Sequence, residues 1–303
     1  STAGYEIFSM MDACQGYHQI YMATEDRIKT SFVTDRGIFC YNVMPFGLKN
    51  AGATYQRLVN KMFAQQIGKT MEVYMDDMLV KSQQLDEHLE HLKAAFAIMR
   101  EHGMKLNPSK CTFGVGGGKF LGYMVSERGI EANPEKIEAV LNLKSPTSIK
   151  EVQRLTGRIA SLNRFISRSA DRNLHFFKIL RKVKGFDWTE ECEQAFQELK
   201  IYLRSPPLLA NPREGDVLYL YLAVSDNAVS SVLTKEEGKV QNPVYYVSKM
   251  LQGAETRYAE IEKLALAVVV TARKLRPYFQ SHRIVVRTNH PLRNILTRPE
   301  ASG

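Results

Sequence analysis

Two adjacent carboxylates, Asp76 and Asp77, stand between apolar residues in the first third of the chain. The flanking segments 71–74 and 78–80 are typical of buried strands, so the acidic pair is expected on a tight hairpin turn. Neighbouring carboxylates repel each other and are costly to bury unless a cation neutralises them, and a hard ion such as Mg²⁺ takes oxygen ligands. The pair therefore points to a divalent metal site, although a solvated acidic turn would explain the pair alone equally well.

A third carboxylate, Asp12, ends the apolar run 7–11 and is followed by Gly16 and Tyr17. Segment 44–57 lies between the two acidic stretches and begins Met-Pro-Phe-Gly. In this order the three stretches resemble the palm motifs of reverse transcriptases, specifically those of gypsy-like LTR retrotransposons. Segment 219–225, Tyr-Leu-Tyr-Leu-Ala-Val-Ser, resembles the plant lineages of that group. The resemblance covers essentially the whole chain, which looks like a Pol polyprotein truncated at both ends.

The resemblance implies an α+β fold in three parts. Residues 1–145 would form a right-hand polymerase palm with partial fingers, and residues 146–205 a basic helical thumb or connection. Residues 206–303 would form an incomplete RNase H-like α/β domain. About half of the fingers, including basic residues for the incoming triphosphate, would be missing before Ser1.

The resemblance also implies the site residues. Asp12, Asp76 and Asp77 would hold two Mg²⁺ or Mn²⁺ ions, one lowering the pKa of the primer 3′-hydroxyl and one neutralising the departing pyrophosphate. Asp77 could instead position the metal ligands without binding a metal ion itself. The residues expected at the nucleotide are Tyr17, Phe46, Gly47 and Lys110. Those expected at template and primer are Gln56, Arg57, Leu121, Gly122, Tyr123, Arg164, Arg168 and Arg172. For Lys110, the sequence favours an ordinary exposed lysine over a contact with the phosphates.

The composition agrees with a nucleic-acid partner. The 303 residues are 44% hydrophobic, enough for two or three modest cores, and the formal net charge is +9. Segment 150–184 holds ten Lys or Arg residues against two acidic residues. Arg164, Arg168 and Arg172 recur at intervals of four, which predicts one phosphate-contacting helical face. Solubility alone would also explain the excess charge.

Other patterns exclude some classes of protein. The four cysteines form no Cys-X-X-Cys pair and have no histidine at zinc-ligand spacing, so we expect reduced thiols in an intracellular protein. There is no apolar run of roughly 18 residues and no signal-peptide pattern, so neither a membrane span nor secretion is predicted. Nucleus and cytoplasm are not distinguished.

Hydrophobic periodicity places the remaining elements of the first part. A hairpin is expected from strands 28–33 and 38–43, and a strand pair that would grip the primer end from 119–124. The predicted helices are 53–62, with Ala53, Leu58 and Met62 apolar, and 85–102, with an apolar stripe. That stripe comprises Leu85, Leu89, Leu92, Phe96 and Met99. Farther on, Trp188 is expected to be a packing anchor before an acidic helix.

In the last part, strands 217–222, 228–233, 243–247 and 283–286 and a helix near 264–269 resemble an RNase H domain. That nuclease needs clustered carboxylates for two metal ions. The first family Asp falls on Ala223 and a later one on Asn289. Only Glu262 remains near the helical acid, and one register puts Leu264 there instead. Asp226, three residues along the strand, would face the opposite side.

The sequence thus predicts an RNA-directed DNA polymerase that uses an RNA template, a DNA primer or RNA–DNA hybrid, and deoxynucleoside triphosphates. The RNase H-like part is predicted to have lost nuclease activity and to pack or bind duplex. The alternative is a catalytically inactive, retroelement-derived nucleic-acid-binding or interaction protein.

Overall fold

The computed structural model describes residues 4–181 and 185–296. The chain divides into two compact units, and the boundary between them in the sequence lies between residues 127 and 128. Each unit has its own sheet and its own core, and each is described here by itself. The predicted division into three parts is finer than these two units and stays a prediction.

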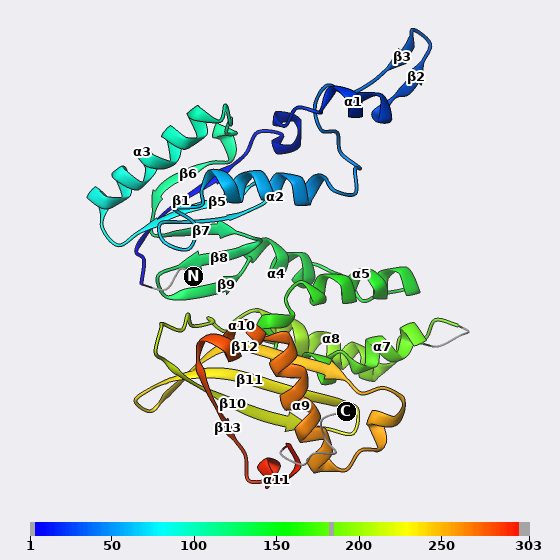
Figure 1. The fold of residues 1–303 in the computed structure, drawn as a ribbon. Helices are drawn as coiled ribbons and strands as arrows, with labels where there is room; N and C mark the ends of the chain where they lie inside the picture. Colours follow the sequence, from blue (N-terminus) through cyan, green and yellow to red (C-terminus); the bar gives the residue numbers. More distant parts are fainter. Residues whose placement is uncertain (1–3, 182–184, 297–303) are drawn as a thin grey trace. The chain divides into compact units, whose positions relative to one another are not determined.

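The first unit is built on a four-stranded antiparallel sheet in the order β4-β5-β1-β6 (Figure 1). The strands are β1 (Ile7–Asp12), β4 (Met71–Tyr74), β5 (Asp77–Ser82) and β6 (Thr112–Val115). β1 occupies an inner position, so the apolar run that ends at Asp12 is buried on both faces. The predicted strands on either side of the acidic pair are confirmed.

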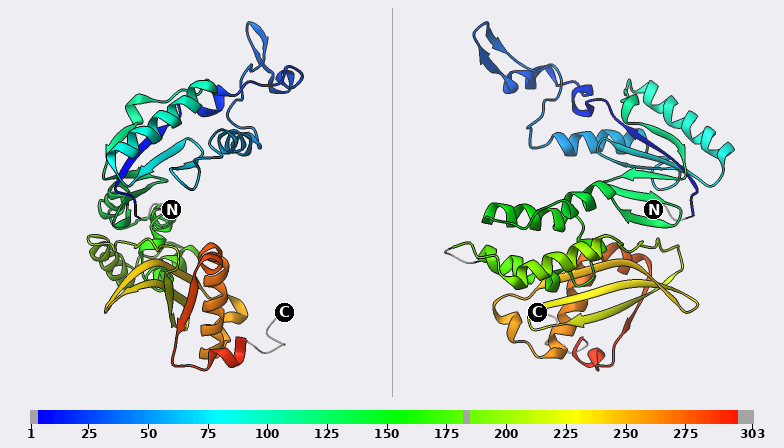
Figure 2. Two further views of the ribbon diagram at one scale, coloured as in Figure 1. Left: turned by 60° about the vertical axis from the view of Figure 1, so that its left-hand side comes forward. Right: turned by 180° about the vertical axis from the view of Figure 1, so that it is seen from behind.

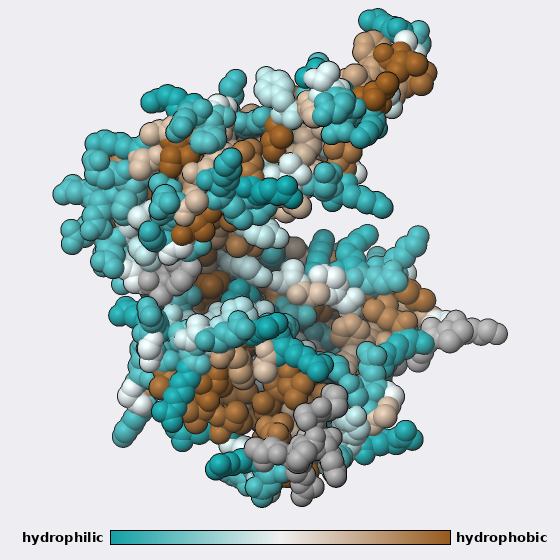
Figure 3. All heavy atoms as spheres, in the orientation of Figure 1, coloured by the Kyte–Doolittle hydropathy of each residue, from teal (hydrophilic) through white to brown (hydrophobic). Residues whose placement is uncertain are grey.

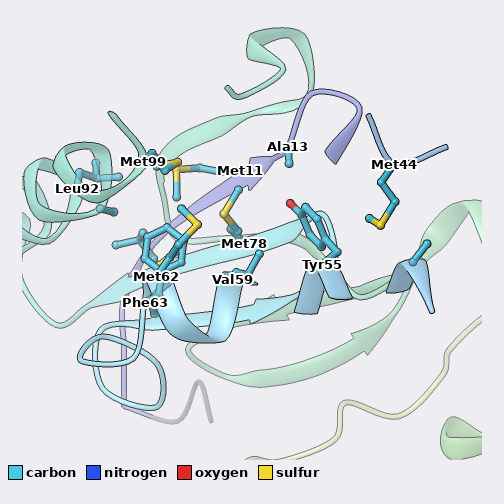
Figure 4. Close-up of a cluster of buried hydrophobic side chains, with 14 residues drawn as sticks. Met11, Ala13, Met44, Tyr55, Val59, Met62, Phe63, Met78, Leu92 and Met99 are labelled. Atoms are coloured by element: carbon cyan, nitrogen blue, oxygen red, sulfur yellow. The ribbon is translucent and has the colours of Figure 1, made fainter. Parts of the chain in front are cut away.

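Two helices cover one face of this sheet, α2 (Ala51–Met62) and α3 (Leu85–Glu101). Their buried side chains mix with Met11 and Met78 of the strands in a methionine-rich core (Figure 4). The hairpin of β7 (Gly117–Phe120) and β8 (Tyr123–Ser126) covers the other face. The core there comprises Phe8, Met10, Leu79, Phe120 and Val125. Alternate residues of β1 and β5 therefore serve two different cores.

The predicted helices exist, but their predicted apolar faces are only partly correct: Met62, Leu92 and Met99 are buried as expected, and other positions are not. α2 leaves Ala53 exposed and buries Ala51, Tyr55, Val59 and Met62. α3 leaves Leu85 and Leu89 exposed and buries His88, Leu92, Ala95 and Met99.

His88 can be buried because both of its ring nitrogens have partners. Nε2 lies 2.7 Å from the Ser9 hydroxyl and Nδ1 lies 2.9 Å from the Ser82 hydroxyl. Ser9 and Ser82 are themselves fully buried, and Ser9 also accepts a hydrogen bond from the Gly114 amide. A satisfied polar chain thus ties α3 to β1, β5 and β6.

A small hairpin extends from the first unit, made of β2 (Phe32–Thr34) and β3 (Gly37–Phe39) (Figure 2). It is shorter than expected because residues 28–30 form a 3-10 turn that follows α1 (Thr24–Arg27). Val33 and Ile38 are largely exposed, and the space-filling view shows hydrophobic residues on the surface of this hairpin next to a hydrophilic tip (Figure 3).

The second unit contains a four-stranded sheet in the order β12-β11-β10-β13, in which only the β10–β13 pair is parallel. The strands are β10 (Val217–Val224), β11 (Ala228–Glu237), β12 (Val240–Met250) and β13 (Arg283–Arg287). α9 (Glu260–Lys274) packs on one face with α10 (Arg276–Ser281) and α11 (Leu292–Leu296). α6 (Ser169–Arg172) contacts β11 and β12 from the other face.

The second unit opens with β9 (Gly129–Ala132), whose Ile130 pairs with Leu209. Its remaining helices are α4 (Pro134–Leu141), α5 (Ile149–Ala160), α7 (Leu174–Arg181) and α8 (Glu190–Leu203). Trp188 stacks on Phe176 at 5.7 Å and meets Phe196 edge-on at 6.0 Å, which confirms it as a packing anchor. No helix in residues 4–181 and 185–296 is long and apolar enough to cross a membrane.

Candidate active site

Asp12 lies directly opposite Asp77 in the antiparallel pairing of β1 with β5. The hairpin turn between β4 and β5 consists of Met75 and Asp76, and the amide of Ala13 donates a hydrogen bond to the Asp76 carbonyl at 3.2 Å. Three carboxylates from two strands and one turn therefore meet at one end of the sheet.

The side chains of these three carboxylates point in two different directions. The preceding residue Met11 and the following residue Met78 belong to the helix-side core, so Asp12 and Asp77 point toward the β7–β8 side. Asp76, in the turn, instead approaches Tyr55 of α2. A Cβ atom placed on Gly16 would collide with Asp76 Oδ1 and would lie 2.8 Å from the Tyr55 ring. Gly16 thus leaves room for the carboxylate and the phenol to lie together.

Burial and like charge disturb the ionisation of the site. Burial raises the pKa of Asp76 above its ordinary value, and the charges of Asp12 and Asp77 raise it further. Burial also raises the pKa of Asp77, with a further contribution from Asp12. Burial beside Asp76 raises the pKa of the Tyr55 phenol. Lys110, with Nζ 3.4 Å from Asp12 Oδ1, and Lys119 bring partly compensating positive charges.

The site has unused capacity for a cation. Asp76 Oδ1 and the Tyr55 hydroxyl are buried, and neither has a hydrogen-bond partner among the described residues. Within residues 4–181 and 185–296, no three His, Cys, Asp or Glu side chains already converge on one point as a metal cage. Carboxylate oxygens of this kind nevertheless suit Mg²⁺, which usually takes one or two protein carboxylates and fills its shell with water or phosphate.

A cavity of about 440 Å³ opens beside Asp12 and Asp77. Lys110 and Lys119 line it, together with Leu121 and Gly122 of the β7–β8 turn. Both turn residues have left-handed backbones, with φ of 51° at Leu121 and 75° at Gly122, and the Leu121 backbone forms a hydrogen bond with Asp77. The expected primer-gripping turn therefore borders the acidic site, and Tyr123 follows as the first residue of β8.

The expected nucleotide residues fall into two groups. Tyr17 and Phe46 lie together with ring centroids 5.3 Å apart, and Tyr17 meets Tyr55 at 5.8 Å. Phe46 is 67% exposed, and Gly47 after it has a φ of 97°. Lys110 belongs instead to the cavity with Asp12.

The two residues of α2 that were expected at the template differ in their exposure to solvent. Arg57 is exposed. Gln56 is half-buried, and its side chain bonds to the backbone of the acidic hairpin. This contact could not be predicted from the sequence pattern, because it joins residues 17 and 19 positions apart. Tyr55 was missed for the same reason.

The predicted arginine face is wrong. The chain between α5 and α7 is not one helix. A 3-10 turn spans Asn163–Phe165, and Arg168 has a left-handed backbone with a φ of 52°, which no α-helix can include. The Arg164 guanidinium lies over the Tyr245 ring at 4.7 Å, and that of Arg172 lies over the Tyr202 ring at 4.6 Å. Arg168 is exposed and lies 3.5 Å from Asp171.

In the RNase H-like sheet, Ala223 pairs with Ser230, which pairs with Ser248 on the next strand. The Ser248 hydroxyl accepts a hydrogen bond from the Ala170 amide, so α6 approaches the face that carries Ala223. Glu262 Oε2 accepts a hydrogen bond from the Ala259 amide and thereby caps α9.

Three further residues complete this end of the sheet. Asn289 follows β13 and is exposed, whereas Leu264 is buried in a core cluster. Asp226 lies in the turn after β10 rather than on the strand, so the expectation based on strand alternation is corrected.

A sheet with paired acids at one end, two helices on one face and a glycine-containing hairpin on the other defines a polymerase palm. Residues 1–125 match the protein family described as reverse transcriptase (RNA-dependent DNA polymerase), and residues 188–286 match the RNase H-like domain found in reverse transcriptase. The chain thus contains a reverse transcriptase region followed by an RNase H-like region, the combination predicted from the sequence.

Among relatives, the chain is 32% identical to the Retrovirus-related Pol polyprotein from transposon opus of Drosophila melanogaster, over 96% of this chain and 30% of the relative. It is 31% identical to the Transposon Tf2-3 polyprotein of Schizosaccharomyces pombe, over 97% of this chain and 22% of the relative. The chain therefore spans less than a third of either relative.

Among solved structures, the foamy viral protease-reverse transcriptase in complex with RNA/DNA hybrid aligns with a TM-score of 0.83 at 18% identity, over 98% of this chain and 40% of that one. The same viral protein in complex with dsDNA aligns with a TM-score of 0.84 at 20% identity, over 97% and 62%. These similarities confirm the predicted combination of a reverse transcriptase fold with an RNase H-like domain.

Proposed function

We propose that this chain is the RNA-directed DNA polymerase region of a retrotransposon Pol polyprotein and works through a two-metal palm site. The observation that carries the proposal is the opposition of Asp12 and Asp77 across β1 and β5, with Asp76 in the adjoining turn. Like charges directly opposed on a sheet destabilise it unless another charge compensates, and Lys110 and Lys119 do so only in part.

Asp12 and Asp76, with Asp77 beside them, are the residues that would hold Mg²⁺ or Mn²⁺. Bound divalent ions would make the primer 3′-hydroxyl more acidic and neutralise the charge of the leaving pyrophosphate. The protein's part is to hold the carboxylates in place at the end of the sheet. Gly16 makes room for Asp76, and the Leu121 backbone orients Asp77.

Substrate contacts follow from the same geometry. Tyr17 and Phe46, with Gly47, would take the sugar and base of the incoming nucleotide, because their paired rings border the Asp76 side of the turn. The Leu121–Gly122 turn, leading into Tyr123, would hold the primer end at the cavity that contains Asp12. Lys110 would leave Asp12 for a phosphate oxygen when a cation takes its place.

The proposed partners are an RNA template, a DNA primer or RNA–DNA hybrid, and deoxynucleoside triphosphates. The viral neighbours in complex with hybrid and dsDNA support nucleic acid as the partner class. We further propose a gypsy-like element of a plant lineage as the source, on the strength of segment 219–225 and the three palm motifs.

The RNase H-like domain is proposed to lack nuclease activity. Ala223 offers no oxygen ligand, Asn289 offers a neutral amide, and Glu262 is already engaged as the helix cap of α9. The Lys263 ammonium is buried and donates to the Ser225 carbonyl, which places a positive charge near the end of β10. A domain of this kind serves packing or duplex binding.

The experiment that tests the polymerase proposal is extension of a labelled DNA primer on an RNA template. The unmodified chain should add nucleotides with Mg²⁺ or Mn²⁺ and should stop when EDTA is added. Duplex binding without any extension, at high protein concentration and with either metal, would support the alternative of an inactive nucleic-acid-binding protein.

A further inference from the structure

Gln56 holds the acidic hairpin by its backbone. Its Oε1 accepts a hydrogen bond from the Met75 amide at 2.8 Å, and its Nε2 donates to the Val73 carbonyl at 3.4 Å and to Asn60 Oδ1 at 2.8 Å. A backbone amide can only donate and a backbone carbonyl can only accept, so these partners fix the orientation of the side-chain amide. Both amide hydrogens of Gln56 are used within the protein.

The residue that Gln56 holds is conformationally unusual. Met75 has a φ of 52°, in the left-handed region of backbone conformation that residues other than glycine and asparagine rarely adopt. Such a conformation persists only where the surroundings enforce it. Here the Gln56 side chain accepts the Met75 amide, and the Met75 side chain lies against Gly52 of α2, where an added Cβ would come within 3.0 Å of its terminal methyl.

We propose that Gln56 is a positioning residue for the acidic hairpin: it fixes the left-handed turn at Met75 and thereby the places of Asp76 and Asp77. Asp76 is the next residue in the chain, so a change in the Met75 backbone moves its carboxylate directly. Gln56 does not read the template, because its donors are already committed to Val73 and Asn60. The consequence for nucleotide addition rests on the proposed function, whereas the effect on the turn does not.

The effect on the turn is measured without any activity. Protein labelled with ¹⁵N-methionine gives one amide signal for each methionine, and Met75→Leu identifies the Met75 signal. Gln56→Met keeps the side-chain length but removes the acceptor, so the Met75 amide should exchange with solvent at least tenfold faster while the other methionine amides stay unchanged. Gln56→Glu keeps the acceptor and should leave that exchange near the wild-type rate; this variant also serves if Gln56→Met does not fold.

Primer extension supplies the second readout. Gln56→Met should lower kcat by about 10- to 100-fold, the loss expected for a misplacement on the scale of 1 Å, with a smaller change in nucleotide KM and an unchanged Kd for template–primer. Asn60→Ala is the matched control: it removes one partner of Gln56 but not the hairpin contacts, and it should retain kcat within about twofold.

Two results would overturn the proposal: unchanged Met75 exchange in Gln56→Met, or weakened template–primer binding at unchanged kcat. The second result would make Gln56 a template contact. If the unmodified chain shows no extension, the proposed function fails, but the exchange experiment still decides whether Gln56 holds the turn.

Discussion

Asp12 and Asp77 face each other across β1 and β5 as a directly opposed pair of like charges. Opposed carboxylates destabilise a sheet in the absence of a cation, and burial of the neighbouring Asp76 adds to the cost. The protein keeps this arrangement at the end of its first sheet, with Lys110 and Lys119 as partial compensation.

Asp76→Asn should stabilise the metal-free protein at pH 7 while it removes activity. The folded-state pKa of Asp76 lies above that of the unfolded chain, so the folded state binds the proton more tightly. Stability is therefore lost as pH rises from the unfolded pKa through the folded pKa, and asparagine avoids that loss. The melting temperature of the variant without metal should exceed that of the wild type by a few degrees at pH 7, and the difference should vanish below about pH 3.5. An equal or lower melting temperature at pH 7 would contradict the electrostatic interpretation.

Gly16→Ala should displace Asp76. The added methyl would collide with the Asp76 carboxylate and with the Tyr55 ring, and because the Tyr55 ring is fully buried the carboxylate is the group that has to move. We expect a loss of about 1–3 kcal/mol in unfolding free energy and a fall in kcat of at least tenfold.

Gly52→Ala is the matched comparison for Gly16→Ala. Its methyl would meet the flexible end of the Met75 side chain at 3.0 Å and lie at an ordinary contact distance of 3.5 Å from the Tyr17 hydroxyl, so its effects on stability and kcat should be smaller than those of Gly16→Ala. Equal effects of the two substitutions in urea unfolding and primer extension would show that Gly16 has no special relation to Asp76.

Arg172→Met should reduce stability and leave the salt dependence of nucleic-acid binding unchanged. The guanidinium lies over Tyr202 and donates to the Ser167 carbonyl at 3.1 Å, so its loss should cost about 1–2 kcal/mol. Arg168→Met, at an exposed position, should change stability by less than about 0.5 kcal/mol. A slope of log K against log salt that falls by about one unit in Arg172→Met would restore this arginine to the phosphate-contacting surface.

The RNase H-like domain should not cleave the RNA strand of an RNA–DNA hybrid. Two metal ions require more negative charge than Glu262 supplies, and that carboxylate already caps α9. A labelled hybrid with Mg²⁺ or Mn²⁺ and no nucleotides tests this expectation directly. Hybrid cleavage that disappears in Glu262→Gln would identify a working nuclease.

The acidic hairpin and its strands could be predicted from the sequence because their signals are local. An apolar run that ends at Asp12, and two short runs around Asp76 and Asp77, specify strands and a turn without reference to the rest of the chain. The resemblance to reverse transcriptases then assigned these segments to the strands and the turn of a palm.

Interactions distant in sequence could not be predicted. A hydrophobic pattern counts His88 as a surface residue. In the structure, Ser9, which is 79 residues away, and Ser82 form hydrogen bonds with both ring nitrogens of His88. α3 therefore buries His88, whereas Leu85 and Leu89 are exposed. Spacing by four placed Arg164 and Arg172 on one helical face, but the helix breaks at Arg168.

The most direct test of the two-metal palm is Asp12→Asn and Asp76→Asn, compared with the wild type in two assays on the same RNA–DNA template–primer. Each substitution removes a carboxylate charge from the metal site without adding bulk. Metal-dependent primer extension should fall by at least a thousandfold, while the Kd for template–primer measured without metal should stay within about twofold. Extension by either variant at the wild-type rate would contradict the assignment of these carboxylates as the catalytic site.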